Sequence, residues 1–263
     1  FAFANMRDRC AVYTSTFEGA DFTGTEWTNL DRAGWDGAGV NFANANFSHA
    51  DLRSMFSSDS GCPIFNFAGA SLEHALMAEV KMNADCYSES VVDWTGAVFD
   101  YSTTNAGGIV AYYEPTPLID VERAQTPSAS FVGIDWGIES WSGAWSAPGS
   151  DFRGARLTGD LSNGSGTNDF TGTDWSGGIW EDFYVQGVDL AGADMTGMAM
   201  SDVEAYSINF TGADMTEMTF DAVVLSEGYG GPIVWGDTTC PDGVNSDDTD
   251  DGTCCHIEGL TCD

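Results

Sequence analysis

The segment VDLAGADMTG at residues 188–197 recurs twenty residues later, little changed, as INFTGADMTE at residues 208–217. In both copies a bulky apolar residue occupies every fifth position, and a small or apolar residue precedes it by two. Asp, Asn, Thr, Ser and Gly fill most of the remaining positions. The same spacing continues on either side of these copies, in the series Phe170, Trp175, Trp180, Val185, Leu190, Met195, Met200, Ala205, Phe210, Met215, Phe220 and Leu225.

A period of five fits neither regular element, because helical neighbours lie three or four residues apart and strand side chains alternate in twos. A chain that turns a corner every five residues does fit it, with the bulky residue and the residue two before it pointing inward. Four such sides make a coil of twenty residues, and stacked coils bury a continuous core. The repetition at twenty therefore predicts a four-sided β-solenoid.

These residues resemble the pentapeptide-repeat family, whose consensus is Ala-(Asp/Asn)-Leu-x-x. The resemblance implies an all-β fold: a right-handed quadrilateral β-helix with inserted loops and a disulfide-rich C-terminal cap. Phe, Trp and Met stand at many central positions where the family prefers Leu, which implies a wider interior. The unit covers most of the chain, reappearing at Phe17, Phe22, Phe42, Phe47, Leu52, Phe67, Leu72, Met77, Phe99, Phe131, Trp136, Phe152 and Leu157.

Breaks in the period locate insertions at about 57–66, 83–91 and 102–128. The last of these carries three prolines, and its residues 118–124 are expected to form one or two helical turns. The repeat ends near Leu225, so we expect a β-helix over 1–227 followed by an acidic, cysteine-rich tail over 228–263. The chain is therefore interpreted as one domain with a terminal cap.

The charge is strongly one-sided, with 41 Asp and Glu against 8 Lys and Arg in 263 residues, for a net charge of -33. Such a surface repels nucleic acid and anionic membranes and favours cations and basic partners. No apolar run approaches the roughly 18 residues of a membrane helix, so no membrane span is expected. Hydrophobic residues make up 43% of the chain and are regularly spaced, which argues against disorder.

Four of the seven cysteines lie in the tail, in a segment too polar to fold by burial alone. This pattern indicates disulfides formed in an oxidising compartment, and hence a secreted or cell-surface protein. A metal site built from Cys254, Cys255 and His256 is the alternative. The disulfide candidates are Cys62, Cys86, Cys240, Cys254, Cys255 and Cys262, with a Cys62–Cys86 bridge between two loops, and Cys10 is the candidate for an intermolecular bond.

The tail also holds the strongest candidate for a ligand site. Oxygen ligands packed into a disulfide-closed loop suit calcium, which takes six to eight of them. A solvated acidic hairpin without metal is the alternative. The candidate calcium ligands are Asp242, Asn245, Asp247, Asp248, Asp250 and Asp251.

No catalytic motif occurs, and His49 and His74 occupy outward repeat positions with no nucleophile at a suggestive spacing. We therefore expect a protein that is not an enzyme. The leading hypothesis is an extracellular structural or surface protein that self-associates head to tail into a filament, through an N-terminal edge that shows no cap.

Two alternatives come from other classes of function. The resemblance to pentapeptide-repeat proteins implies a DNA mimic that inhibits or modulates a type II topoisomerase, since some members of the family match DNA in charge and shape. The other alternative is an adhesive module that binds basic proteins or glycans through Trp141 and Trp145 in surface loops.

Overall fold

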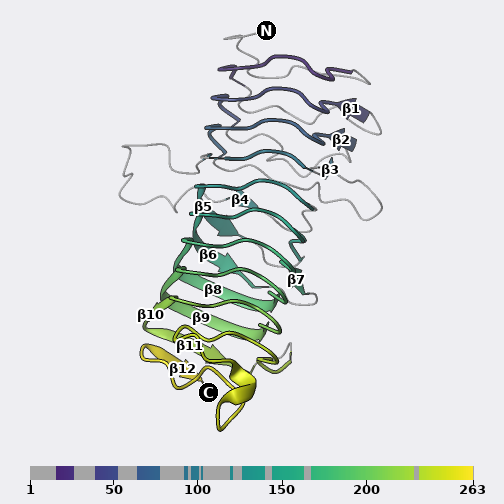
Figure 1. The fold of residues 1–263 in the computed structure, drawn as a ribbon. Helices are drawn as coiled ribbons and strands as arrows, with labels where there is room; N and C mark the ends of the chain where they lie inside the picture. The colour runs from purple at the N-terminus through teal and green to yellow at the C-terminus, as the bar shows by residue number, and fades with distance from the viewer. Residues whose placement is uncertain are drawn as a thin grey trace, which may run out of the picture.

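The computed structural model describes residues 16–26, 39–52, 64–77, 92–93, 96–100, 102, 119–120, 126–139, 144–162, 167–227 and 231–262. Parallel strands stack along one axis, with β1 near the N-terminal end and β12 near the C-terminal end (Figure 1). The fold is the expected right-handed, four-sided β-helix. Its strands are β1 (Gly39–Asn41), β2 (Ile64–Asn66), β3 (Val92–Asp93), β4 (Ile119–Asp120), β5 (Asp135–Glu139), β6 (Arg156–Leu161), β7 (Asn168–Asp169), β8 (Ile179–Asp189), β9 (Ala199–Asn209), β10 (Thr219–Asp221), β11 (Val223–Ser226) and β12 (Leu260–Cys262), and one 3-10 helix, η1, spans Ser246–Asp248.

The twenty-residue register is confirmed between β8 and β9, where Ile179 pairs with Ala199 and Asp189 pairs with Asn209. Isolated parallel bridges continue the same stacking from Asp174 to Asp194 and from Asp194 to Asp214. Each residue of one coil therefore lies directly beside its counterpart in the next coil, about 4.8 Å away.

Two sides of each coil turn their corners through tight β-turns. At Leu190–Ala193 the amide of Ala193 donates to the carbonyl of Leu190 at 3.0 Å, and Gly192 has a φ of +68°. A positive φ at the third residue defines a type II turn and favours glycine there. The glycine two residues after many central residues is explained by this geometry.

The other two sides run through the long strands β8 and β9, in which inward and outward side chains alternate. Phe183 and Val185 are buried, while Tyr184 between them and Gln186 after them face outward. Strand β9 repeats this pattern one coil later, with Val203 and Ala205 buried. The outer surface on these sides is consequently a parallel sheet whose outward side chains are half-buried or exposed.

Aromatic side chains stack along the interior. Phe99, Phe131, Phe152 and Trp175 form one ladder, with ring centroids 4.9, 4.5 and 4.0 Å apart in turn. All four side chains are fully buried. The expectation of a wide interior filled by Phe, Trp and Met is met in this part of the chain.

Three details differ from expectation. β2 takes the last three residues of the stretch 57–66, where an insertion is predicted. β4 lies inside the stretch 102–128 and pairs in parallel with β5, so the helical turns expected at 118–124 are wrong at Ile119–Asp120. Trp145 is fully buried and its Nε1 donates to Thr126 Oγ1 at 2.9 Å, so its expected place in an adhesive surface loop is also wrong.

The tail supplies the last coil of the β-helix and then closes it. Val234 and Thr239 bridge in parallel to Asn209 and Asp214, and β12 pairs with β11 in register. Between these segments a hairpin folds back, with an antiparallel bridge from Thr239 to Asn245. Ser246 is buried beneath the coil, where its hydroxyl donates to the carbonyl of Trp235 at 2.7 Å.

Among the described residues, no helix has the length and apolar character needed to cross a membrane.

Candidate functional site

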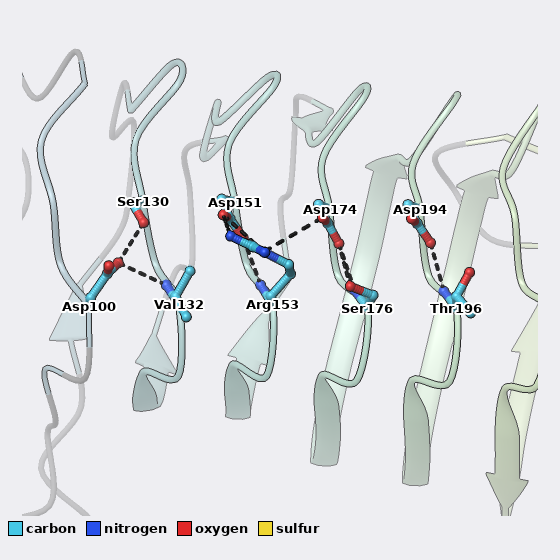
Figure 2. A network of polar contacts seen from close by, with 9 residues as sticks. All are labelled: Asp100, Ser130, Val132, Asp151, Arg153, Asp174, Ser176, Asp194 and Thr196. Carbon is cyan, nitrogen blue, oxygen red and sulfur yellow. Dashed lines mark hydrogen bonds and ion pairs between the residues drawn. The ribbon is translucent and has the colours of Figure 1, made fainter.

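The most regular polar feature of the surface is a row of carboxylates that we call the aspartate column: Asp151, Asp174, Asp194 and Asp214. Parallel bridges join each member to the next, so the four lie on successive coils. Three of them appear side by side in Figure 2, on neighbouring coils. Each member directly precedes a fully buried residue, which fixes its side chain on the outer surface.

Each of these carboxylates accepts a hydrogen bond from the backbone two residues later in its own coil. Oδ1 of Asp174 accepts from the amide of Ser176 at 3.0 Å, and Asp194 and Asp214 bind the amides of Thr196 and Thr216 in the same way. Such Asx turns satisfy a backbone donor at each corner. The hydrogen bonds of Asp194 and Asp214 within the described residues use Oδ1, and both side chains are exposed.

At one corner the column has a serine, and an aspartate of the neighbouring coil supplies the carboxylate there. Ser130 occupies the column position, and Asp100 of the preceding coil accepts from Ser130 Oγ at 2.5 Å and from the amide of Val132 at 3.1 Å (Figure 2). A carboxylate is thus kept at this corner although its position in the sequence has changed.

A second column stands on the adjoining side, at Asp169, Asp189 and Asn209. Oδ1 of Asp169 accepts from the amide of Thr171 at 3.1 Å, and Asp189 binds the amide of Ala191 at 3.0 Å. Asn209 Nδ2 donates to Asp189 Oδ1 at 3.0 Å, which joins two coils. Asp169, Asp189 and Asn209 therefore form a second polar column beside the aspartate column.

Arginine neutralises only one end of the aspartate column. The guanidinium of Arg153 bonds to Asp151 at 2.6 Å and lies 3.7 Å from Asp174. Arg156 bridges Asp135 at 2.9 Å and Glu181 at 2.8 Å on the two flanking coils. No Lys or Arg follows Arg156 in the sequence, so the rest of the rod carries carboxylates without a matching cation of this kind.

The pKa of Asp151 is lowered from its ordinary value. Burial raises this pKa, but hydrogen bonds from the side chain and the amide of Arg153, together with its charge, lower it by more. A depressed pKa stabilises the fold above the ordinary value of the carboxyl, and this stabilisation is lost as pH falls through the folded-state value.

Replacing Arg153 with glutamine is therefore expected to raise the pKa of Asp151 toward the ordinary value of a carboxyl. Carboxyl-carbon NMR titration measures this directly. Arg156→Gln is the matched control, because Arg156 contacts Asp135 and Glu181 instead and should leave Asp151 unchanged. An unaltered Asp151 titration in Arg153→Gln would contradict the assigned cause.

The density of charge along the axis follows from the register. The coil 179–198 carries Glu181, Asp182, Asp189 and Asp194, and the coil 199–218 carries Asp202, Glu204, Asp214 and Glu217. Each coil adds about 4.8 Å of length. Four carboxylates per coil amount to roughly one negative charge per 1.2 Å, against about 1.7 Å for duplex DNA.

The tail does not gather the expected calcium ligands into one cluster. Asn245 Nδ2 donates to Asp237 at 2.8 Å, Asp242 pairs with His256 at 3.0 Å, and Asp251 accepts from the amide of Thr253 at 3.1 Å. Asp247 and Asp248 are exposed in η1, and Asp250 is exposed just after it. Over the described residues, no group of three or more His, Cys, Asp or Glu side chains is arranged to hold a metal ion.

The tail cysteines form two disulfides, Cys240–Cys254 and Cys255–Cys262. The alternative of a metal site at Cys254, Cys255 and His256 is thereby excluded, since both sulfurs are bonded. Cys10, Cys62 and Cys86 lie outside the described residues, as do Trp141 and the uncapped N-terminal edge expected from the sequence.

The remaining histidines show no catalytic arrangement. His49 and His74 are exposed on neighbouring coils with their rings stacked at a centroid distance of 4.9 Å. Each stands at a corner with positive φ.

Sequence reasoning missed an outward-facing pair of tyrosines. Tyr184 and Tyr206, on β8 and β9, lie with ring centroids 5.5 Å apart. Their outward position follows from the sequence, because Tyr184 directly precedes Val185 and Tyr206 directly follows Ala205, two core residues of the five-residue series. The absence of Lys and Arg after residue 156 is likewise visible in the sequence.

Comparison with known proteins gives a match to one family model. Pentapeptide repeats match residues 15–54 in 8 copies. Among curated protein sequences, none matches the chain significantly.

Two solved structures resemble the chain at low identity. HetL, a pentapeptide repeat protein involved in heterocyst differentiation regulation from the cyanobacterium Nostoc, is 14% identical over 93% of this chain and 92% of its own, with a TM-score of 0.31. QnrB1, a plasmid-mediated fluoroquinolone resistance protein, is 15% identical over 97% of this chain and 92% of its own, with a TM-score of 0.32.

The leading expectation, an extracellular structural protein that forms head-to-tail filaments, is wrong. The geometry gives the physical reason, because filament growth needs an open strand edge at both ends. Here the hairpin at Thr239–Asn245 covers one edge of the last coil. The strand β12, which pairs with β11 at the end of the rod, has only three residues.

The chain contains pentapeptide repeats, matched over residues 15–54, and the same turns and the same inward ladder continue to the last coil.

Proposed function

We propose that this protein is a non-enzymatic DNA mimic that occupies the DNA-binding surface of another protein, and that a type II topoisomerase is its partner. The observation that carries the proposal is the charge density of the rod after residue 156, roughly one carboxylate per 1.2 Å, which is of the same order as that of duplex DNA.

The form of the molecule supports the same proposal. A DNA-binding surface is a long groove lined by Lys and Arg that recognises regularly spaced phosphates. The aspartate column offers carboxylates at a regular spacing on a rigid scaffold, since each Asp is fixed by its Asx turn. Rigid presentation lowers the entropy lost when the partner binds.

The absence of internal cations matters as much as the presence of acids. A carboxylate already paired with arginine has little to offer a basic partner, as at Asp151 and Glu181. Asp189, Asp194 and Asp214 have no ion pair among the described residues. These three carboxylates are expected to contact Lys and Arg of the partner directly.

A DNA supercoiling assay with a bacterial gyrase tests the proposal. The protein is expected to inhibit supercoiling at low ionic strength, and inhibition should weaken steeply as salt rises. A variant with Asp189→Asn, Asp194→Asn and Asp214→Asn should inhibit about tenfold less strongly, since three exposed charge contacts together contribute about 1.4 kcal/mol. Asn keeps the Asx acceptor, so the fold should be retained.

A matched control separates the column from net charge alone. Asp247→Asn, Asp248→Asn and Asp250→Asn remove three charges from the exposed tail, none of them a member of either column. This variant should inhibit as the unmodified protein does. Equal loss of inhibition in the two triple variants would contradict a role for the ordered column, and no inhibition by the unmodified protein would contradict the proposed partner.

A further inference from the structure

We propose that the outer face of the sheet formed by β6, β8 and β9 recognises arginine side chains, through the aromatic pair Tyr184 and Tyr206. The inference rests on the proposed basic partner. It adds which side chains of that partner are bound and which face of this protein binds them. The occupant to which it commits is an arginine-rich segment of that partner.

The register places the pair among carboxylates. Tyr184 lies beside Asp160 of β6 on one coil and Glu204 of β9 on the next. Tyr206 lies beside Gln186 of β8. The two rings are tilted by 39° with centroids 5.5 Å apart, so they lean toward each other across the coils.

Both rings are held in place but remain partly open to solvent. Tyr184 and Tyr206 are half-buried. Glu204, which pairs with Tyr184 and lies two residues before Tyr206 on β9, is exposed. The pKa of Tyr184 is raised by burial first, and then by Tyr206, Asp160 and Glu204. The phenol consequently stays neutral at physiological pH and the carboxylates lie within electrostatic range of it.

This combination suits a guanidinium better than an ammonium. Arginine stacks its planar group on aromatic rings and forms paired hydrogen bonds with carboxylates, while lysine is a strongly hydrated point charge. Tyr and Arg are also enriched at the centres of protein interfaces. An arginine that covers the ring of Tyr184 would have the carboxylates of Asp160 and Glu204 on either side.

The cation has to come from another molecule. Arg156, the nearest basic residue before β8 in the sequence, already bridges Asp135 and Glu181. No Lys or Arg follows it in the chain. Charge complementarity therefore points to a basic partner and argues against a second copy of this acidic chain.

Two peptides serve as probes: nine arginines and nine lysines, which carry equal charge. Calorimetric titration is expected to give about fivefold tighter binding of the arginine peptide, from the stacking of guanidinium on the tyrosines. Tyr184→Thr with Tyr206→Thr should abolish this preference, and Tyr184→Phe with Tyr206→Phe should keep it. Threonine is a good strand residue, and a circular dichroism melt checks that each variant is folded.

Asp194→Asn with Asp214→Asn is the matched control, on another side of the rod, and should weaken both peptides equally. Retention of the arginine preference in the threonine variant, or its absence in the unmodified protein, would overturn the inference. If the unmodified protein prefers arginine through the tyrosines but fails to inhibit gyrase, the proposed topoisomerase fails and the arginine-reading face stands. If it inhibits gyrase without any arginine preference, the proposed topoisomerase partner stands and the arginine-binding face fails.

Discussion

Replacing Trp175 with alanine is expected to lower the free energy of unfolding by about 4 kcal/mol. Trp175 is fully buried and stacks on Phe152 of the preceding coil at a centroid distance of 4.0 Å. It also meets Phe170 and Trp180 edge-on at 5.6 and 5.4 Å. Alanine would leave a cavity that the stacked coils can close only in part.

Urea unfolding followed by circular dichroism measures this change, as a lower midpoint at an unchanged slope. Trp175→Phe is the control, since it keeps an aromatic ring on Phe152 and gives up only the hydrogen bond from Nε1 to Thr173 Oγ1 at 2.9 Å. A cost of about 1.5 kcal/mol or less is expected there. If Trp175→Ala cost no more than Trp175→Phe, the aromatic ladder would not be what holds the coils together.

Removing the Cys240–Cys254 disulfide is expected to cost about 3 kcal/mol, because the bond closes a loop with a sequence separation of 14. Cys240 is also a core residue, following Met195 and Met215 in the inward ladder one coil later. The double variant Cys240→Ser with Cys254→Ser would place two hydroxyls in this buried site. The end of the β-helix should therefore open before the rest unfolds.

Hydrogen exchange of the β11 and β12 amides detects such local opening. The matched control is Cys255→Ser with Cys262→Ser, which removes the disulfide with a sequence separation of 7 and should cost less, about 2.4 kcal/mol. Unchanged protection of β11 in the first variant would contradict the role assigned to the hairpin as the cap of the last coil.

The regular part of the fold could be predicted from sequence because the five-residue period repeats there without interruption. The register from Asp174 to Asp194 to Asp214 needs only the period, since insertions are absent from these two coils. The inward ladder follows from the same count. Handedness came from the family resemblance alone, because a period of five does not distinguish a right-handed coil from its mirror image.

The irregular parts could not be predicted in the same way. Ile119–Asp120 forms a strand because β5 offers it a partner in register, a tertiary effect that local composition does not contain. Trp145 is buried because its coil shifts the five-residue phase, so its indole finds Thr126 inside the rod. The tail hairpin depends on Ser246 fitting beneath Trp235, which no spacing of residues shows.

The candidate site was predicted in part. The twenty-residue register stacks the carboxylates into columns, whereas the charge that these columns present to a partner depends on where the arginines lie. Arg153 neutralises one end of the aspartate column and Arg156 pairs with Asp135 and Glu181, which sequence spacing alone does not show. Calcium binding by the tail stays a prediction, since composition records carboxylates but not their directions.

Competition for DNA tests the central claim most directly. A fluorescent duplex bound to gyrase is titrated with the protein, and the anisotropy of the duplex is followed at low and moderate salt. The account predicts that the protein displaces the duplex, with a lower apparent affinity at higher salt and in the variant carrying Asp189→Asn, Asp194→Asn and Asp214→Asn. Retention of the duplex at saturating protein, whether in a ternary complex or because the protein does not bind, would contradict it.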